Sequence, residues 1–170
     1  EGALVARLLQ DTDVDHVLGL DVSHRALRKA ARRLHLDTMT PRQRERVDLA
    51  QGSLTYRDRR LAGADAACVV EVVEHLDAGR LEAFERVLFA HAHPRVVVVT
   101  TPNVEYNARF PALASGHLRH ADHRFEWTRA EFAGWAEATA SAHGYTVAFH
   151  PVGDVDPDVG PPTQMAVFSR

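Results

Sequence analysis

Three side chains that carry metal-binding atoms follow a single apolar run of the sequence. The segment VVEVVEHLD (69–77) begins like a buried strand and then presents Glu71, Glu74 and His75. If the chain turns helical where the strand ends, these residues stand at positions i, i+3 and i+4, and their side chains share one face. Carboxylate and imidazole ligands without a thiolate suit a hard divalent ion, and the histidine shifts the preference from magnesium toward manganese or another transition metal. The segment is therefore a candidate divalent-metal site, and the competing interpretation is that His75 is a packed or substrate-side histidine.

A second set of candidate ligands lies in RHADHRFEWTRAEF (119–132), a polar segment that runs into a predicted helix. It contains His120 and His123 with an acid between them, and either imidazole could supply a further ligand. The chain has 11 histidines, so a chance cluster is the competing interpretation.

A third polar segment, TTPNVEYNARF (100–110), follows directly on an apolar strand pattern. Its Asn103 and Tyr106 would therefore lie at the edge of the sheet where such folds bind ligands. A polar turn imposed by Pro102 explains this segment as well as a substrate contact does.

The elements that must position these residues alternate between helical and strand patterns. Strands that are apolar on both faces and are separated by helices indicate a parallel sheet covered on both sides. The last two strands have no helix between them, which predicts a closing antiparallel hairpin with GDVDPDVGPP (153–162) as its loop. We therefore predict an α/β fold with a mostly parallel sheet and a C-terminal antiparallel hairpin. The predicted helices span 3–9, 23–34, 81–91 and 128–144, and the predicted strands span 16–21, 47–51, 66–72, 95–101, 145–150 and 164–170.

The beginning of the chain predicts a nucleotide-binding turn. In doubly wound folds that bind nucleotides, the first strand leads into a glycine-rich turn, and the second strand ends in an acid that holds a ribose. Here Gly2 runs directly into the first helix, and Asp21 ends the next strand nineteen residues later. We interpret the chain as a single domain over residues 1–170 that begins inside the glycine-rich loop, with its first strand missing. An Asp at a strand end is also a common turn residue, so Asp21 alone leaves both interpretations open.

Composition limits the classes of function. Hydrophobic residues make up 45% of the 170 residues and charged residues 25%, as in an ordinary globular domain. The formal net charge of −3 excludes the strongly basic balance of a protein that wraps duplex nucleic acid, although a local basic patch can still contact a few phosphates. The single Cys68 leaves no disulfide framework, and the apolar runs are too short to cross a membrane. We predict a cytoplasmic protein without a membrane partner.

Together, these segments resemble one enzyme family. EVVEHL, TPNVEYN and RHADHRFEWTRAEF, with GLDVS and GSLTYRD upstream, closely resemble the HEN-type small-RNA 3′-terminal ribose 2′-O-methyltransferases, in particular their bacterial RNA-repair branch. EVVEHL and GLDVS are shared widely among S-adenosylmethionine enzymes, whereas the pairing of TPNVEYN with HADHRFEW is specific to this family. The resemblance covers nearly the whole chain. It implies a Rossmann-like class I S-adenosylmethionine-dependent methyltransferase fold, and methyl transfer to the 2′-OH of the 3′-terminal ribose of RNA in RNA repair or end protection.

The resemblance also implies which residues form the site. In many other methyltransferases a similar Glu-His-Leu stretch holds no metal, and His75 would then be a packed or substrate-side histidine. In this family the stretch binds a metal, together with a histidine of the HxDH-type segment. The implied catalytic and metal-binding residues are Glu71, Glu74, His75 and His123, with His120 as the alternative ligand and His75 or His120 as the proton acceptor. The implied residues around S-adenosylmethionine are Gly2, Asp21, Val22, Ser53 and Leu54.

The implied partner is the single-stranded 3′ end of RNA, and an RNA kinase-phosphatase or ligase is the implied repair partner. Arginines interleaved with aromatic residues could hold the last phosphates and stack the end base. One alternative is a small-molecule O-methyltransferase of the same fold, which leaves HADHRFEW unexplained. The other is a non-catalytic metal-binding or RNA-binding fragment. The implied RNA-binding residues are Tyr56, Arg57, Asn103, Tyr106, Arg119 and Arg124.

Overall fold

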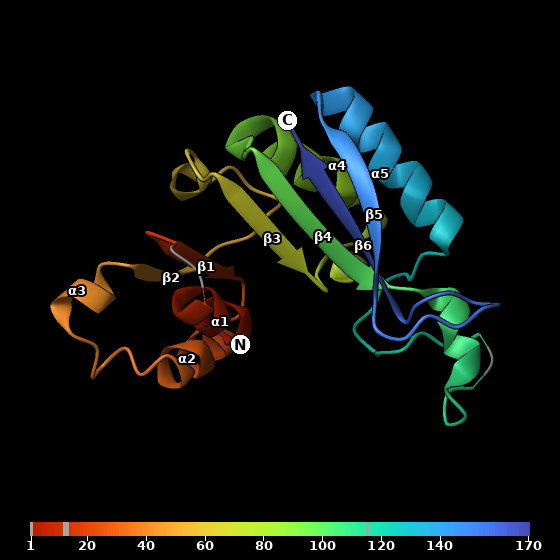
Figure 1. Cartoon of the computed structure of the whole chain (residues 1–170), viewed down its shortest axis with the longest axis horizontal. Helices are drawn as coiled ribbons and strands as arrows, with labels where there is room; N and C mark the ends of the chain where they lie inside the picture. The colour runs from red at the N-terminus through yellow and green to blue at the C-terminus, as the bar shows by residue number, and fades with distance from the viewer. Residues whose placement is uncertain (1, 12–13, 115) are drawn as a thin grey trace. The chain divides into compact units, whose positions relative to one another are not determined.

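The computed structural model of the chain describes residues 2–11, 14–114 and 116–170. The chain divides into two compact units, residues 1–56 and 57–170, and each is described by itself. The predicted α/β class is confirmed, because each unit has a pair of parallel strands and the second unit also has an antiparallel pair near the C-terminus (Figure 1). The assignment of one domain to residues 1–170 stays a prediction. Within the described ranges, no helix is both long enough and apolar enough to cross a membrane.

The first unit places the ends of two parallel strands together. Its elements are α1 (Ala3–Asp11), β1 (Val17–Asp21), α2 (His24–Arg33), α3 (Pro41–Arg44) and β2 (Val47–Gln51). The two strands are in register, with Asp21 opposite Gln51 at their carboxyl ends. Ser23 begins α2 as its N-cap, because its side chain accepts a hydrogen bond from the backbone N–H of Ala26. The predicted helix start is therefore confirmed.

Gly2 allows the start of α1 to lie directly against α2. It has a φ of +84°, and a Cβ added to it would lie 2.8 Å from the Cα of Ala30, a buried residue of α2. Its carbonyl also accepts the first hydrogen bond of α1, from the backbone N–H of Ala6 at 2.9 Å. Only glycine meets both the conformation and the close approach at this position.

The second unit is built on a four-stranded mixed sheet. Its strands are β3 (Ala66–Val70), β4 (Val96–Pro102), β5 (Thr146–Val152) and β6 (Thr163–Ser169). They lie in the order β3-β4-β6-β5, so that β6 returns between β4 and β5 (Figure 1). β3 and β4 are parallel, and the other two pairs are antiparallel. The predicted closing hairpin is confirmed, and the carboxyl ends of β3 and β4 lie together at one edge.

The helices of the second unit include one that changes its winding. α4 (Leu81–Glu85) continues as the π-helical segment η4 (Arg86–Ala92), so the helix predicted over 81–91 is present with wider turns in its second half. α5 (Arg129–His143) begins with a capping box between Thr128 and Glu131 and ends at the left-handed Gly144, as its sequence predicts. The remaining helices are the 3₁₀ turns η1 (Arg59–Leu61), η2 (Val73–His75), η3 (Ala78–Arg80) and η5 (Val104–Arg109).

Aromatic packing fixes the helices of this unit to its sheet. The rings of Phe89 in η4 and Phe168 in β6 are both fully buried, with their centroids 4.8 Å apart. Trp135 of α5 stands near Phe168, and its Nε1–H donates a hydrogen bond of 2.8 Å to Glu85 Oε1 at the end of α4. η4 and α5 therefore both pack against β6, and α5 is also hydrogen-bonded to α4.

Candidate functional site

Three of the predicted metal ligands converge in the second unit. One ligand atom from each of Glu74, His75 and His123 lies within 4.8 Å of the other two. Glu74 and His75 belong to η2, the turn that follows β3. His123 comes from the loop before α5, and the backbone N–H of Arg124 donates a 2.8 Å hydrogen bond to the carbonyl of Glu74. This hydrogen bond joins the two separate sequence segments at the sheet edge.

The carboxyl group of Glu74 is buried and only half satisfied. The residue is 0% exposed, and its Oε2 accepts a hydrogen bond of 3.0 Å from Oγ1 of Thr101. Its Oε1 is buried and has no hydrogen-bond partner among the described residues. Burial, aided by the neighbouring charge of Glu71, raises the pKa of this carboxyl to about 7. A buried carboxylate oxygen without a hydrogen-bond donor destabilises the fold unless a cation binds it. Glu74 is therefore well suited to be a metal ligand.

Hydrogen bonds orient both imidazole rings in the same way. Nδ1 of His75 lies 3.2 Å from the carbonyl oxygen of Asp122, and Nδ1 of His123 lies 2.6 Å from Oε1 of Glu126. A carbonyl and an ionised carboxylate only accept, so both Nδ1 atoms carry the hydrogen and both Nε2 atoms keep their lone pair. The ring centroids are 4.9 Å apart. Two imidazole nitrogens and one carboxylate oxygen suit manganese or another transition metal better than magnesium.

Glu71 lies outside this group of three, which corrects the prediction of a single helical face. Its backbone is left-handed, with a φ of 52°, and it precedes η2 rather than standing on it. Its Oε1 accepts a hydrogen bond of 3.0 Å from Oγ1 of Thr100, and its backbone N–H donates to the Thr100 carbonyl at 3.1 Å. The turn that ends β3 therefore moves Glu71 off the face that Glu74 and His75 share. The role of Glu71 as a ligand stays a prediction.

His120 lies beside the group but is not one of its members within the described part of the chain. It is exposed, and its ring centroid is 6.4 Å from that of His75. Its Nδ1 accepts a hydrogen bond of 3.2 Å from the backbone N–H of Asp122. Of the two imidazoles that the sequence leaves open, the structure brings His123 into the group.

The predicted cofactor residues lie in the first unit. The Asp21 carboxylate accepts a hydrogen bond of 2.8 Å from the backbone N–H of Ser23, as a turn residue does. The backbone N–H of Gly52 donates to the Asp21 carbonyl at 3.1 Å, which brings the segment after β2 alongside the end of β1. The carboxyl edge of parallel strands is where folds of this class bind ligands. The predicted residues at this edge are Asp21, Val22, Ser53 and Leu54, and Gly2 begins α1.

Asn103 is not available to RNA, which corrects that prediction. It is 0% exposed, and its side-chain amide donates to the carbonyls of Val159 (2.8 Å) and Pro161 (2.9 Å). Its Oδ1 accepts a hydrogen bond of 3.0 Å from the backbone N–H of Glu105. Asn103 therefore begins η5 and fastens it to the loop between β5 and β6.

Other predicted RNA-binding residues form an aromatic and basic cluster. The rings of Tyr106 and Phe110 meet edge to face with centroids 5.6 Å apart. The guanidinium of Arg119 lies 5.0 Å from the Phe110 centroid, and it also donates to Oδ1 of Asn107. Phe110 is 37% exposed. A planar guanidinium held over a partly exposed ring is an arrangement that can accept a nucleic-acid base.

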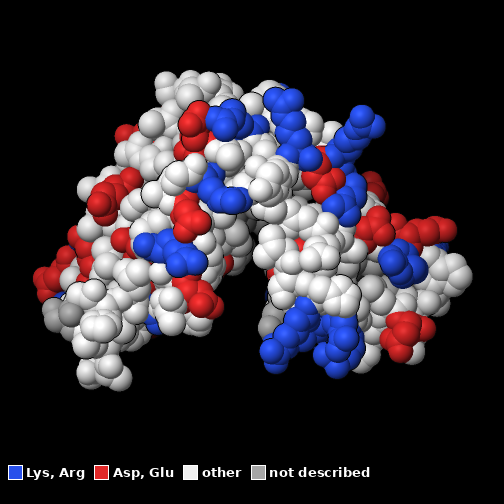
Figure 2. Space-filling view, turned by 180° about the vertical axis from the view of Figure 1, so that it is seen from behind, with Lys and Arg blue, Asp and Glu red and all other residues white. Residues whose placement is uncertain are grey.

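The remaining predicted RNA-binding residues are on the surface. Arg124 is exposed, and its Nε lies 3.5 Å from the carboxylate of Asp77. Tyr56 and Arg57 are exposed and stand on either side of the boundary between the two units. Figure 2 shows acidic and basic side chains interspersed over the face that it presents. An attraction for phosphate must therefore come from local groups of arginines, as the net charge of −3 also indicates.

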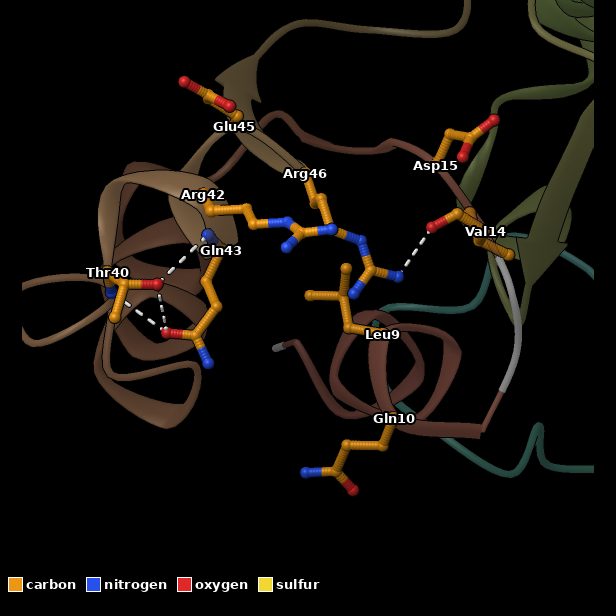
Figure 3. Close-up of a pocket in the computed structure, with 9 residues that line it drawn as sticks. All are labelled: Leu9, Gln10, Val14, Asp15, Thr40, Arg42, Gln43, Glu45 and Arg46. Carbon is orange, nitrogen blue, oxygen red and sulfur yellow. Dashed lines mark hydrogen bonds between the residues drawn. The ribbon is translucent and has the colours of Figure 1, made fainter.

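One hollow of the first unit is lined, among the described residues, by none of the predicted site residues. It has a volume of about 880 Å³ and lies beside Val14 and Arg46, which precede β1 and β2 (Figure 3). Figure 3 shows Arg46 reaching toward Val14, whose carbonyl accepts its hydrogen bond of 2.7 Å. Since the two strands are parallel, this hollow is at their amino ends, away from the edge that carries Asp21.

The raised pKa of Glu74 predicts how the stability of the metal-free protein depends on pH. The pKa is about 7 in the folded protein, against an ordinary value of 4.5 for a glutamate in water, so the folded state binds the proton more tightly than the unfolded state does. The stabilisation that this proton provides is present below pH 4.5 and is lost as pH rises through 7. As pH rises from below 4.5 to above 7, the free energy of unfolding of the natural protein should therefore fall, relative to that of Glu74→Gln, by at most on the order of 3 kcal/mol. Denaturant unfolding of both proteins at pH 5 and pH 8, with a chelator, measures this difference; an unchanged difference would contradict the burial of an ionisable group here.

Comparison with known proteins finds small RNA 2′-O-methyltransferases among both the curated sequences and the solved structures. The chain is 37% identical over 164 residues to the small RNA 2′-O-methyltransferase of Gallus gallus, which covers 92% of this chain and 43% of the relative. It is 43% identical over 127 residues to that of Xenopus tropicalis, covering 73% of this chain and 34% of the relative. The crystal structure of the methyltransferase domain of bacterial CtHen1 matches with 48% identity and a TM-score of 0.89, over 99% of this chain and 85% of that one. No family model matches the sequence. The chain spans less than half the length of these curated relatives.

Proposed function

This chain belongs to the Hen1 family of small RNA 2′-O-methyltransferases, and from that premise we propose that it transfers a methyl group from S-adenosylmethionine to the 2′-OH of the 3′-terminal ribose of RNA. The observation that carries the proposal is that Glu74 and His75, which follow β3, converge with His123 from the loop before α5. The reaction would serve RNA repair or end protection. A kinase-phosphatase or ligase partner in repair stays a prediction, as does a cytoplasmic location.

We propose that Glu71, Glu74, His75 and His123 hold a divalent ion, manganese in preference to magnesium. The buried Oε1 of Glu74 supports this assignment, because a cation would satisfy an oxygen that has no hydrogen-bond donor among the described residues. Glu71 is kept in the set because its charge is near enough to raise the pKa of Glu74. When bound, the ion supplies positive charge and Lewis acidity at the ribose hydroxyls.

The cofactor would bind at the carboxyl edge of the first unit. The Asp21 carboxylate has the acceptor chemistry to hold the hydroxyls of a ribose, and Ser53 and Leu54 follow β2 at the same edge. Val22 is 65% exposed and can pack against a ligand there. When bound, S-adenosylmethionine supplies an electrophilic methyl group on a sulfonium sulfur. The contribution of Gly2 is conformational, because it sets the start of α1.

The chain's own residues act mainly by positioning. In the transfer, a bond forms between the 2′-oxygen and the methyl carbon, the carbon–sulfur bond breaks, and the hydroxyl proton is lost. Holding the two reactants in line supplies much of the rate of such a displacement. Because Nδ1 of His120 accepts the Asp122 N–H, Nε2 carries the hydrogen in the neutral ring. We therefore assign His120 to donating a hydrogen bond to the RNA end, and solvent to receiving the proton.

The RNA end would meet the aromatic and basic cluster beside this site. The backbone N–H of Arg119 donates to the same Glu126 oxygen that contacts His123, at 2.6 Å in each case. A base stacked on Phe110 would lie beside the Arg119 guanidinium, whose backbone N–H shares the Glu126 oxygen with His123. Tyr106 and Arg124 are proposed to contribute to the same strand-end binding, and Tyr56 and Arg57 are proposed as further RNA contacts.

The test is methyl transfer by the full-length protein to a single-stranded RNA that ends in free 2′- and 3′-hydroxyls. With labelled S-adenosylmethionine and Mn²⁺, label should enter the RNA, and the modified end should resist periodate because the vicinal diol is gone. A catechol offered under the same conditions should stay unlabelled. Labelling of the catechol but not of RNA would favour the small-molecule enzyme, and no labelling of either would favour the non-catalytic interpretation.

Asp21 gives a separate prediction for cofactor binding. Asp21→Ala should weaken the binding of S-adenosylhomocysteine to the full-length protein by roughly 10–100-fold, because the ribose would lose a charged acceptor. The alanine also loses the turn hydrogen bond to Ser23, so Asp21→Asn, which keeps an acceptor oxygen for that N–H, is the matched variant. Calorimetry measures both variants, and an affinity for S-adenosylhomocysteine that neither variant changes would remove Asp21 from the site.

A further inference from the structure

Glu126 is a buried carboxylate that contacts His123, one of the three candidate metal ligands. Its side chain is 0% exposed. Its Oε1 lies 2.6 Å from His123 Nδ1 and accepts the backbone N–H of Arg119 at 2.6 Å. Its Oε2 accepts the side-chain amide of Asn107 at 2.6 Å. These donors are a ring N–H and two amides, and among the described residues no guanidinium or ammonium hydrogen-bonds to the carboxylate.

We infer that Glu126 is the residue that positions His123 for the metal. The inference rests on the proposed metal site of Glu74, His75 and His123. A buried carboxylate that accepts the Nδ1–H of a histidine fixes the ring and its tautomer, so that the Nε2 lone pair is always the one presented. The nearby negative charge also makes that lone pair a stronger donor toward a cation. His75 has only a neutral carbonyl in the corresponding place, at Asp122.

The same carboxylate also ties the metal group to the proposed RNA-binding cluster. Asn107, which donates to Glu126, belongs to η5 and accepts the Arg119 guanidinium on its own Oδ1. Arg119 in turn lies over Phe110. One buried charge therefore sets the position of His123 and the position of the arginine and ring beside it.

The first test is the affinity of the full-length protein for Mn²⁺, measured by calorimetry. Glu126→Gln should bind Mn²⁺ roughly 10–100-fold more weakly than the natural protein, as expected for loss of a carboxylate behind a histidine ligand. Glu131→Gln is the matched control, since it makes the same change of charge nearby while glutamine can still form the capping box with Thr128. The control should bind Mn²⁺ as the natural protein does.

A double variant separates positioning and charge from simple loss of structure. In Glu126→Gln, the new amide N–H₂ faces the amide N–H₂ of Asn107, which leaves two donors opposed. Adding Asn107→Asp gives the glutamine amide an acceptor and returns the negative charge to this cluster, but at a position away from His123. We expect the double variant to recover the melting temperature of the natural protein while its Mn²⁺ affinity stays at least roughly fivefold weakened.

A readout without metal tests the tautomer directly. In the metal-free natural protein, the ¹⁵N spectrum of the His123 ring should show hydrogen on Nδ1 at pH 8. In Glu126→Ala the His123 ring should populate both neutral tautomers. The ¹⁵N pattern of the His75 ring should stay unchanged, because its partner is the Asp122 carbonyl.

The outcomes distinguish this inference from the proposed function. If the natural protein does not bind Mn²⁺, the metal site fails and the inference fails with it. If the natural protein binds Mn²⁺ and Glu126→Gln binds it equally well, only the inference is overturned. Full recovery of affinity together with stability in the double variant would reduce Glu126 to a structural residue and would also overturn it. Weak binding by Glu126→Gln, with the control unchanged and the double variant stable but still weak, supports it.

Discussion

Replacing Glu74 by glutamine is expected to weaken Mn²⁺ binding by at least about 100-fold and to slow methyl transfer roughly 10²–10³-fold, while stabilising the metal-free protein. The weaker Mn²⁺ binding and the higher stability without metal have one cause. The Oε1 of Glu74 is buried without a donor, which costs the metal-free fold and suits a cation. A glutamine in the same place can still accept the Thr101 hydroxyl, and its amide can donate to a lone pair of His75 or His123.

The measurement is a pair of melting curves for each protein, one with Mn²⁺ and one with a chelator. The natural protein should melt higher with Mn²⁺, and Glu74→Gln should melt at the same temperature in both conditions, because linkage to a ligand requires binding. Glu85→Gln is the matched control, since Glu85 accepts a hydrogen bond from Trp135 outside the group. If Mn²⁺ raised the melting temperature of Glu74→Gln as much as that of the natural protein, Glu74 would not be a ligand.

The sequence predicted the elements and the three side chains that converge at the candidate site, because local patterns mark most of them. Apolar strands separated by amphipathic helices specify the α/β class, and a capping residue marks the start of α2 and of α5. Polar residues that follow an apolar strand are conspicuous, so Glu74 and His75 could be found from their position alone. The choice of His123 needed the resemblance to a family, because His120 has the same chemistry three residues earlier.

The corrections concern residues whose surroundings come from distant parts of the chain. Glu71 was placed by assuming helical spacing, but the turn that ends β3 depends on its hydrogen bonds to Thr100, 29 residues away. Asn103 looks like a surface residue in sequence, and only the loop 56 to 58 residues later, which covers it, makes it a buried anchor. Spacing along the chain carries no information about such contacts.

Glu126 was missed because its surroundings, too, come from other segments of the chain. In a polar segment it reads as one more exposed acid, and its burial appears only when η5 and the loop before α5 pack together. The i, i+3 spacing from His123 is the signal that could have found it. Thr100 and Thr101 were likewise read as the end of an apolar strand, although their hydroxyls hold Glu71 and Glu74. The residues that support the predicted ligands are thus harder to predict than the ligands.

The chemistry of the RNA end gives the other large effect. With the full-length protein and Mn²⁺, an RNA that ends in a 2′,3′-diol should be methylated, and a 2′-deoxy end should not react because it lacks the nucleophile. A 3′-deoxy end keeps the nucleophile and removes only its neighbour. We expect it to react at least about 100-fold more slowly, since a 3′-hydroxyl held at the Glu74–His75–His123 group would be worth on the order of 3 kcal/mol in orienting the ribose.

The 3′-deoxy RNA is therefore the decisive substrate, and the other ends serve as its controls. A 3′-phosphate should also react poorly, because it adds bulk and charge where the 3′-hydroxyl would lie, but that result alone would not separate steric exclusion from a lost contact. The 3′-deoxy end is smaller than the diol, so slow reaction with it cannot be steric. An enzyme that methylates internal riboses would be indifferent to every one of these ends. Equal rates on diol and 3′-deoxy ends, or full activity with a chelator present, would mean that Glu74, His75 and His123 do not hold the terminal ribose in the way proposed.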